Sequence, residues 1–288
     1  STPQTISLDT GGQIVIDKNL TINGPVAEAT VQRSTAGGTP NFRVFYVSPG
    51  NIVTINRLTI ANGSVTGTFP TGFGAGVFND QATLTINNSI VRNNIAGGFG
   101  GGLYNSSGSL TVNSTTIRNN SSTSESGGGI GSRTTGGGSS LLNINNSTIS
   151  GNSALSGGGG GIFNSSVVGG LNATATITNS TISGNTALSA GGIGNLAVLG
   201  TTTLNLNNST VARNSGTSFG GGVRNDQISG SALTNLSSSI IGDNTSALGP
   251  DILNAGTLGG SYNLVETTTG YAFGSGSNNI FGVDPLLV

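Results

Sequence analysis

The chain has 288 residues, of which 51 are glycine and 7% are charged, and its formal net charge is −1. It contains no cysteine and no histidine, which excludes disulfides, thiolate chemistry, Cys-based metal sites and histidine general-base catalysis. A net charge so close to zero predicts no nucleic-acid partner. No apolar run reaches the roughly 18 residues of a membrane span, so we expect no membrane insertion by this segment.

The first fifty residues contain alternating apolar stretches without a strict repeat. "QIVIDKNLTING" (13–24) and "RVFYVSPGNIVTIN" (43–56) have the period-two alternation of strands. We therefore expect residues 1–50 to form irregular N-terminal coils of the same structure that follows them.

Residues 53–254 contain seven related copies of one motif, such as "LTINNSIVRNN" (84–94) and "LNINNSTISGN" (142–152). Aligned on the second aliphatic residue, the copies are spaced 26 to 33 residues apart. Every copy has short alternating stretches, and none has apolar residues at helical spacing, so the copies predict strands. The aligned aliphatic residues are Ile55, Ile86, Val112, Ile144, Ile177, Leu206 and Leu236.

A glycine-rich motif, of which "GGGLYN" (100–105) and "GGGIFN" (159–164) are examples, separates the copies. Glycine is required where the backbone has positive φ or where neighbouring backbones leave no room for a Cβ. Each copy thus reads as three short strands, an Asn corner, a loop and a glycine turn. This pattern predicts an all-β chain folded as a right-handed parallel β-helix of about nine coils with three strands each.

In such a solenoid, equivalent aliphatic residues stack in columns that fill the interior. We expect one domain over residues 1–288, with residues 255–288 as the C-terminal coils and cap. Besides the column at the aligned positions, three more are predicted. They are Leu84, Leu110, Leu142 and Leu204; Val91, Ile117, Ile149, Ile182, Val211 and Ile241; and Val77, Leu103, Ile130, Ile162, Ile193, Val223 and Ile252.

The Asn that closes each repeat falls at one equivalent corner of successive coils. Stacked side-chain amides can hydrogen-bond to one another and to the turn backbone. The predicted structural ladder consists of Asn94, Asn120, Asn152, Asn185, Asn214 and Asn244.

The "GGxxN" motif paired with a following "xIxxN" resembles the short repeats of the chlamydial polymorphic outer membrane proteins, with Ile or Val in place of the Phe of their second motif. The resemblance covers roughly residues 13–287 and extends to the broader class of bacterial right-handed β-helix surface proteins. It implies the β-helix fold and export to the cell surface or the medium, and it implies no particular activity.

Parallel β-helices include polysaccharide lyases and glycosidases, so an enzyme of this kind is an alternative for this chain. Glycoside hydrolysis usually needs two carboxylates about 5–10 Å apart. Among the ten acidic residues, only Asp243 and Asp251 lie across one corner of one coil, so they are the weak catalytic candidates. The glycine motifs lack the Asp column of calcium-binding β-helices, so we expect no metal and no cofactor.

Two outward-facing features are candidates for surface contacts. Arg92 and Arg118 fall at the same position of successive coils, which favours an anion contact or simply a soluble surface. Thr148, Thr181 and Thr210 form an outward column of the kind that can hydrogen-bond sugars or order water.

These patterns predict an exported, non-catalytic rod: an extracellular structural protein, an adhesin stalk or a fibre subunit of a secreted bacterial protein. Unpaired strands at the ends favour end-to-end self-association, and a glycan or another cell-surface ligand is the other expected partner. Two alternatives remain open, a carbohydrate-active or glycan-binding β-helix and an ice-binding solenoid.

Overall fold

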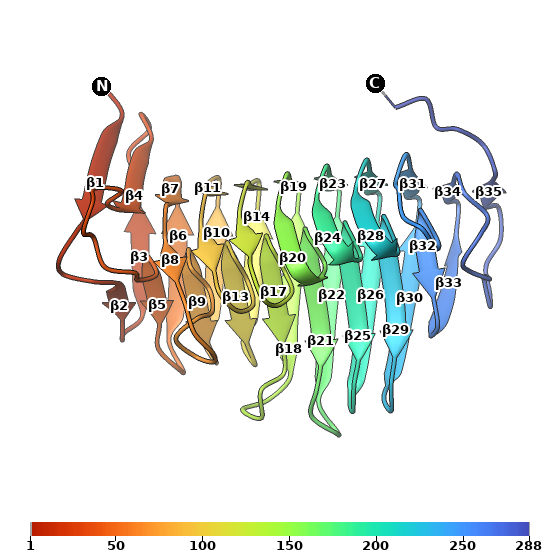
Figure 1. Ribbon diagram of the computed structural model, residues 1–288, viewed down its shortest axis with the longest axis horizontal. Coiled ribbons are helices and arrows are strands. Elements are labelled where there is room, and N and C mark those ends of the chain that lie inside the picture. Colours follow the sequence, from red (N-terminus) through yellow and green to blue (C-terminus); the bar gives the residue numbers. More distant parts are fainter. Residues whose placement is uncertain (1, 288) are drawn as a thin grey trace.

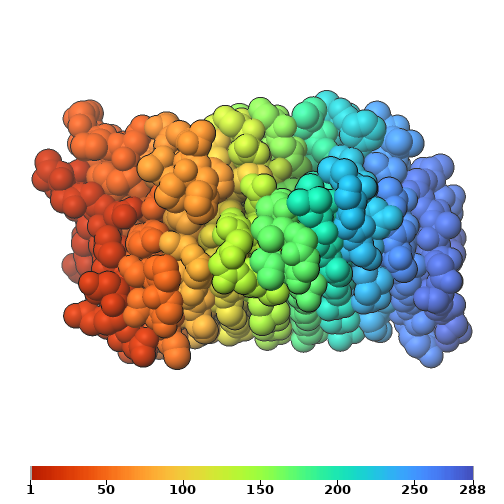
Figure 2. Space-filling model, turned by 90° about the horizontal axis from the view of Figure 1, so that it is seen from below, coloured from red at the N-terminus to blue at the C-terminus, as the bar shows by residue number. Residues whose placement is uncertain are grey.

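The computed structural model describes residues 2–287, and they form a parallel β-solenoid without a helix. The chain advances along one axis turn by turn from its N-terminus to its C-terminus (Figure 1). In the space-filling view the colours accordingly run in successive bands along the rod (Figure 2). The predicted all-β solenoid is confirmed.

Each turn contributes a strand to each of three long sheets, here called A, B and C. Sheets B and C have nine strands each, which corresponds to about eight full turns between the first and the last strand. Sheet B contains β2 (Ile14–Ile16), β5 (Phe45–Val47), β9 (Val77–Asp80), β13 (Leu103–Ser106), β17 (Ile130–Arg133), β21 (Ile162–Ser166), β25 (Ile193–Ala197), β29 (Val223–Gln227) and β32 (Ile252–Asn254). Sheet C contains β3 (Leu20–Asn23), β6 (Ile52–Asn56), β10 (Thr83–Asn87), β14 (Ser109–Asn113), β18 (Ser140–Asn145), β22 (Asn172–Thr178), β26 (Thr201–Asn207), β30 (Ser231–Ser237) and β33 (Thr257–Ser261).

Sheet A follows sheet C in each turn and has eleven strands, most of them short. Its strands are β1 (Gln4–Leu8), β4 (Ala29–Arg33), β7 (Leu58–Ala61), β11 (Ile90–Arg92), β15 (Thr116–Arg118), β19 (Thr148–Ser150), β23 (Thr181–Ser183), β27 (Thr210–Ala212), β31 (Ile240–Gly242), β34 (Leu264–Val265) and β35 (Ile280–Phe281). Among the described residues, the strand pairings in these sheets are all parallel, as a solenoid requires.

A fourth, six-stranded sheet D occupies the segment that the repeat pattern assigned to a loop. It contains β8 (Ser64–Val65), β12 (Ile95–Ala96), β16 (Ser121–Ser122), β20 (Ser153–Gly158), β24 (Thr186–Ser189) and β28 (Ser215–Phe219). Half of these strands are only two residues long, too short to show a period-two alternation. The turns therefore have three or four strands.

The four aliphatic columns lie inside the solenoid and in register. Ile86 pairs with Ile55 on one side and Val112 on the other, and all three are essentially inaccessible to solvent. The leucine column continues through Ala175 between Leu142 and Leu204. One continuous cluster of buried aliphatic side chains thus runs the length of the rod and supplies the apolar burial that a chain with so few charges needs to fold.

The glycine motif is required at the turn into sheet B. Gly100 has a φ of +70°, and a Cβ at Gly101 would lie 2.4 Å from the carbonyl oxygens of Ser121 and Gly128. The backbones of successive turns approach too closely here for any side chain. The glycine-rich stretch is therefore a packed corner, not a flexible linker.

Beyond β33 the chain adds only the two-residue strands β34 and β35, and the segments around them lie against the last full turn. Gly260 donates its backbone N–H to Ser275, and Asn254 donates to Gly270. Within residues 2–287 there is no helix with the length and apolar character needed to cross a bilayer.

Candidate functional site

The six closing asparagines form a buried ladder at the corner between sheets A and D. The first five amide nitrogens each donate to the Oδ1 of the next Asn at 2.9–3.0 Å, and that of Asn244 donates to Asp251. The same Oδ1 atoms accept backbone N–H groups, and the nitrogens also donate to carbonyls such as that of Ile117. All of the amide groups are thereby satisfied inside the protein. The members are Asn94, Asn120, Asn152, Asn185, Asn214 and Asn244.

Sequence reasoning missed a second buried ladder at the end of the sheet B strands. Here the Asn of each "GGxxN" motif donates to the next, as Asn164 does to Asn195 and Asn195 to Asn225 at 2.8 Å. Ser132 and Ser140 replace the amide at one turn and accept from Asn105. The recurring Asn of the glycine motif was the available signal, because a polar residue repeated directly after a core aliphatic residue needs a buried partner.

The predicted surface residues lie on the outer face of sheet A. Arg92 pairs in register with Arg118, and Thr148 with Thr181, which pairs with Thr210. The threonine column is continued by Ile240 at one end and reaches Ile90 beyond Thr116 at the other. The structure thus places these residues together on one outward strip of sheet A.

The two candidate catalytic carboxylates have different surroundings. Asp251 is fully buried and ends the Asn ladder: its Oδ1 accepts the Asn244 amide at 2.9 Å, and its Oδ2 accepts the Thr267 N–H at 2.6 Å. Asp243 lies near the surface, 3.6 Å from the guanidinium of Arg213. A buried carboxylate whose two oxygens both hold structural N–H groups is poorly placed to transfer a proton to a substrate.

Asp243 is also part of an acidic group in which carboxylate oxygens of Asp243, Glu266 and Asp284 lie within 4.8 Å of one another. One Glu266 oxygen accepts the Asp243 backbone N–H at 2.6 Å, and Arg213 provides a positive charge beside the group. These contacts give the carboxylates a local structural role at the C-terminal end of sheet A.

The outer face of sheet B differs from the other faces because loops cover it. The loops that lead from sheet D into sheet B pack on a cluster of aromatic rings. Phe78 and Tyr104 contact edge to face, with ring centroids 5.2 Å apart. The members are Phe73, Phe78, Phe99, Tyr104 and Phe163, with Tyr46 and Leu196 packed against them.

Burial alters the acid–base properties of groups on this face. The guanidinium of Arg43 lies 5.0 Å from the centre of the Phe78 ring, and its desolvation lowers its pKa to about 10. Burial, helped by a hydrogen bond of 2.6 Å to Asp80, raises the pKa of Tyr46 to about 12. Burial also raises the pKa of Tyr104, whose hydroxyl has no hydrogen-bond partner among the described residues.

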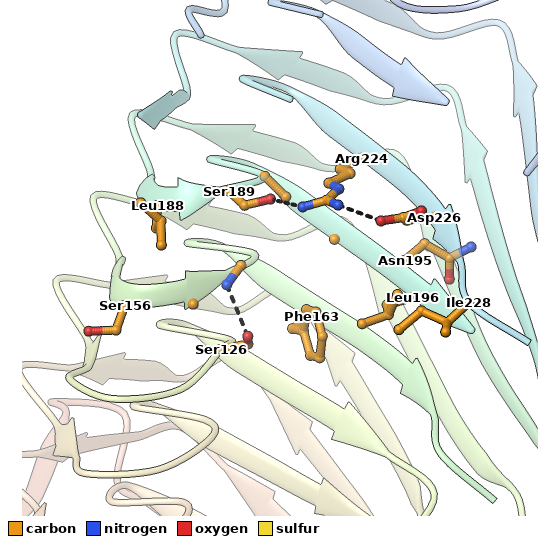
Figure 3. Close-up of a pocket in the computed structure, with 14 residues that line it drawn as sticks. Ser126, Ser156, Phe163, Leu188, Ser189, Asn195, Leu196, Arg224, Asp226 and Ile228 are labelled. Atoms are coloured by element: carbon orange, nitrogen blue, oxygen red, sulfur yellow. Dashed lines mark hydrogen bonds and ion pairs between the residues drawn. The ribbon is translucent and has the colours of Figure 1, made fainter. Parts of the chain in front are cut away.

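Toward the C-terminal half of the same face lies a pocket of about 310 Å³ (Figure 3). Phe163 lies at its floor, and Leu188 and Ile228 stand on opposite sides. Arg224 closes one end, where its guanidinium donates to Ser189 at 2.6 Å and forms an ion pair with Asp226. We take this pocket as the candidate binding site because it combines an apolar floor with a few convergent polar groups.

None of the polar groups in this pocket is among the site residues predicted from the sequence. Phe163 lies in the glycine motif "GGGIFN" (159–164), which predicted a turn and a strand. Arg224 occurs in only one copy of the repeat, "GGGVRND" (220–226), and Asp226 shares its position with Asp80 alone, so the shared pattern gives no sign of their ion pair.

Comparison with known proteins finds no matching family model, no matching curated protein and no matching solved structure. The assignment to the parallel β-solenoid fold therefore comes from the structure of this chain itself.

Proposed function

We propose that the chain is a non-catalytic β-solenoid rod that serves as an extracellular structural or adhesive scaffold of a bacterium. The observation that carries this proposal is the unbroken series of buried amide hydrogen bonds from Asn94 to Asp251, which parallels the aliphatic core through six turns. Such an interior supports a rigid, elongated shape. The resemblance of the "GGxxN" repeats to bacterial surface proteins supports the extracellular setting.

The surroundings of the carboxylates support a non-catalytic role. Asp251 ends the buried ladder, Asp226 is paired with Arg224, and Asp80 accepts the hydroxyl of Tyr46. Glycosidase chemistry needs two carboxylates that face one substrate from opposite sides. These three carboxylates are instead engaged by protein donors in separate parts of the rod.

Electron microscopy, limited proteolysis and turnover assays on a polysaccharide panel would test the proposal. We expect short rods that resist proteinase K and release no reducing ends from any polysaccharide. Turnover that disappears in Asp226→Asn or Asp251→Asn would overturn the non-catalytic role.

The rod is also proposed to associate end to end. Strands β1 and β35 are the outermost strands of sheet A, and exposed apolar side chains accompany them, Ile6 near one edge and Phe281 at the other. Free parallel edges pair readily with another strand. Sedimentation velocity should show mass increasing with concentration, and a single monomeric species at every concentration would contradict this association.

A further inference from the structure

The candidate pocket lies beside one glycine, Gly194, on the outer face of sheet B. Successive turns place Phe78, Tyr104, Gly131, Phe163, Gly194 and Arg224 at equivalent, paired positions. The two glycines, Gly131 and Gly194, leave gaps in this outward column. Of the two, Gly194 lines the pocket.

The gap at Gly131 is filled by neighbouring aromatic residues. A Cβ built there would lie 3.2 Å from the ring of Tyr104 and 3.4 Å from Phe99. At Gly194 a Cβ would lie 2.9 Å from the ring of Phe163 and 3.4 Å from Ala190, but unlike Gly131 this glycine lines the pocket that extends toward Arg224. A side chain at Gly194 would therefore collide with the Phe163 floor and take up part of the pocket.

The polar end of the pocket is electrically neutral but rich in hydrogen-bonding groups. Arg224 and Asp226 neutralise each other, and their side chains remain 31% and 21% exposed. A guanidinium has five N–H donors, of which the hydrogen bonds to Ser189 and Asp226 use two. Asp226 keeps acceptor capacity beyond the N–H of Gln227 and the guanidinium.

The remaining walls are apolar and reach into solvent. Leu188 from sheet D is 44% exposed, and Ile228 from the loop after β29 is 70% exposed. They stand on either side of the Phe163 floor (Figure 3). Two exposed aliphatic side chains that flank a hollow are suited to cover the C–H surface of a ring-shaped ligand.

We propose that this pocket binds one ring of an uncharged saccharide. The hydroxyls would bond to the free donors of Arg224 and the free acceptors of Asp226, while the C–H face lies over Phe163 and Gly194. A charged ligand gains little, because the cation already has an anion beside it. A purely aliphatic peptide side chain would bury the polar pair without satisfying it, which costs free energy.

Protein NMR titration with methyl glycosides of glucose, galactose, mannose and N-acetylglucosamine would test the site. We expect at least one of them to shift the resonances of Phe163, Gly194, Leu196 and Arg224. Asp226→Asn keeps the size of the side chain and removes its charge, and it should weaken binding about tenfold. The matched control, Arg213→Ala, breaks the other surface ion pair outside the pocket and should leave binding unchanged.

Three results would overturn the inference. The first is no shift in the pocket with any of the four glycosides at 100 mM. The second is equal binding by Asp226→Asn with its fold intact by circular dichroism. The third is binding of methyl glucuronide or an acidic peptide in place of the neutral sugars. None of these results bears on the rod-like, non-catalytic scaffold, which microscopy and turnover assays test separately.

Discussion

The corner between sheets A and D repeats one residue type from turn to turn, whereas the outer face of sheet B varies from turn to turn. At the corner, six turns repeat the same buried Asn with the same hydrogen bonds, whereas on sheet B the equivalent outward position changes from Phe78 to Gly131 to Arg224. Both positions belong to the same repeats. Regularity in this chain thus maintains the solenoid, whereas departures from the repeat create the candidate pocket.

The largest effect is expected from breaking the ladder in its middle. Asn152→Ala would leave the backbone N–H of Asn120 without its Oδ1 acceptor, and would remove one acceptor of the Asn120 amide and the side-chain donor to Asn185. Together with the bond to the Ile117 carbonyl, four buried hydrogen bonds are lost, which should lower the free energy of unfolding by about 3–5 kcal/mol, as chemical denaturation would show.

Asn145→Ala is the matched control for the ladder. Asn145 also belongs to an amide row and donates to Asn113 at 2.9 Å, but it lies on the outer, half-buried face of sheet C. We expect a loss below about 1 kcal/mol. Equal losses in the two variants would contradict the special role of the buried corner.

The next largest effect concerns the aliphatic core. Ile144→Ala removes a fully buried side chain that pairs with Val112 and Ile177, and should lower the free energy of unfolding by about 3 kcal/mol. Asn143→Ala on the outer face of the same strand should cost far less. A tolerated Ile144→Ala would show that the stacked interior is not what holds the rod together.

A substitution at the end of the ladder should lower the free energy of unfolding less than one in its middle. Asp251→Asn keeps an oxygen for the Asn244 amide but places an N–H group against the N–H of Thr267, which should cost about 2 kcal/mol. Asp243→Asn, at the surface beside Arg213, should change stability by less than about 0.5 kcal/mol. Thermal denaturation of both variants would distinguish these two carboxylates.

The smallest effect on the free energy of unfolding is expected in the aromatic cluster on the outer face of sheet B, where the substitution should stabilise the protein. Because the buried hydroxyl of Tyr104 has no partner among the described residues, Tyr104→Phe should stabilise the protein by about 1 kcal/mol at pH 7. A destabilised variant would show that this hydroxyl is satisfied in solution.

The pH dependence of unfolding gives a second measurement on the same face. Burial raises the pKa values of Tyr104 and Tyr46, the latter to about 12, so above pH 10 the unfolded state releases phenol protons that the folded state keeps. These tyrosines therefore stabilise the fold below pH 10, and this contribution is lost as the pH rises. The pKa of Arg43 is lowered to about 10, so above pH 10 the folded state releases a proton that the unfolded state keeps. The contribution of Arg43 to the free energy of unfolding therefore rises with pH over the same range. Tyr104→Phe should flatten the net loss between pH 10 and pH 12.

The repeat made much of the fold predictable. Each copy meets only its neighbours, so residues at equivalent positions must stack, and the alignment of Ile144 with Ile177 already implied their contact. The same logic predicted that Asn152 and Asn185 would be neighbours. The sequence could not show that β16 (Ser121–Ser122) is a strand, because two polar residues carry no periodic signal.

Local alternation and a repeat of about thirty residues were enough to specify the common part of the protein: strand periodicity, stacking and a buried aliphatic interior. The individual part depends on packing between turns. Gly131 and Gly194 look alike in the sequence, yet Tyr104 and Phe99 pack at Gly131 while Gly194 lines the pocket beside Phe163. A pocket depends on how side chains from several turns share a volume, and no repeat pattern encodes that packing.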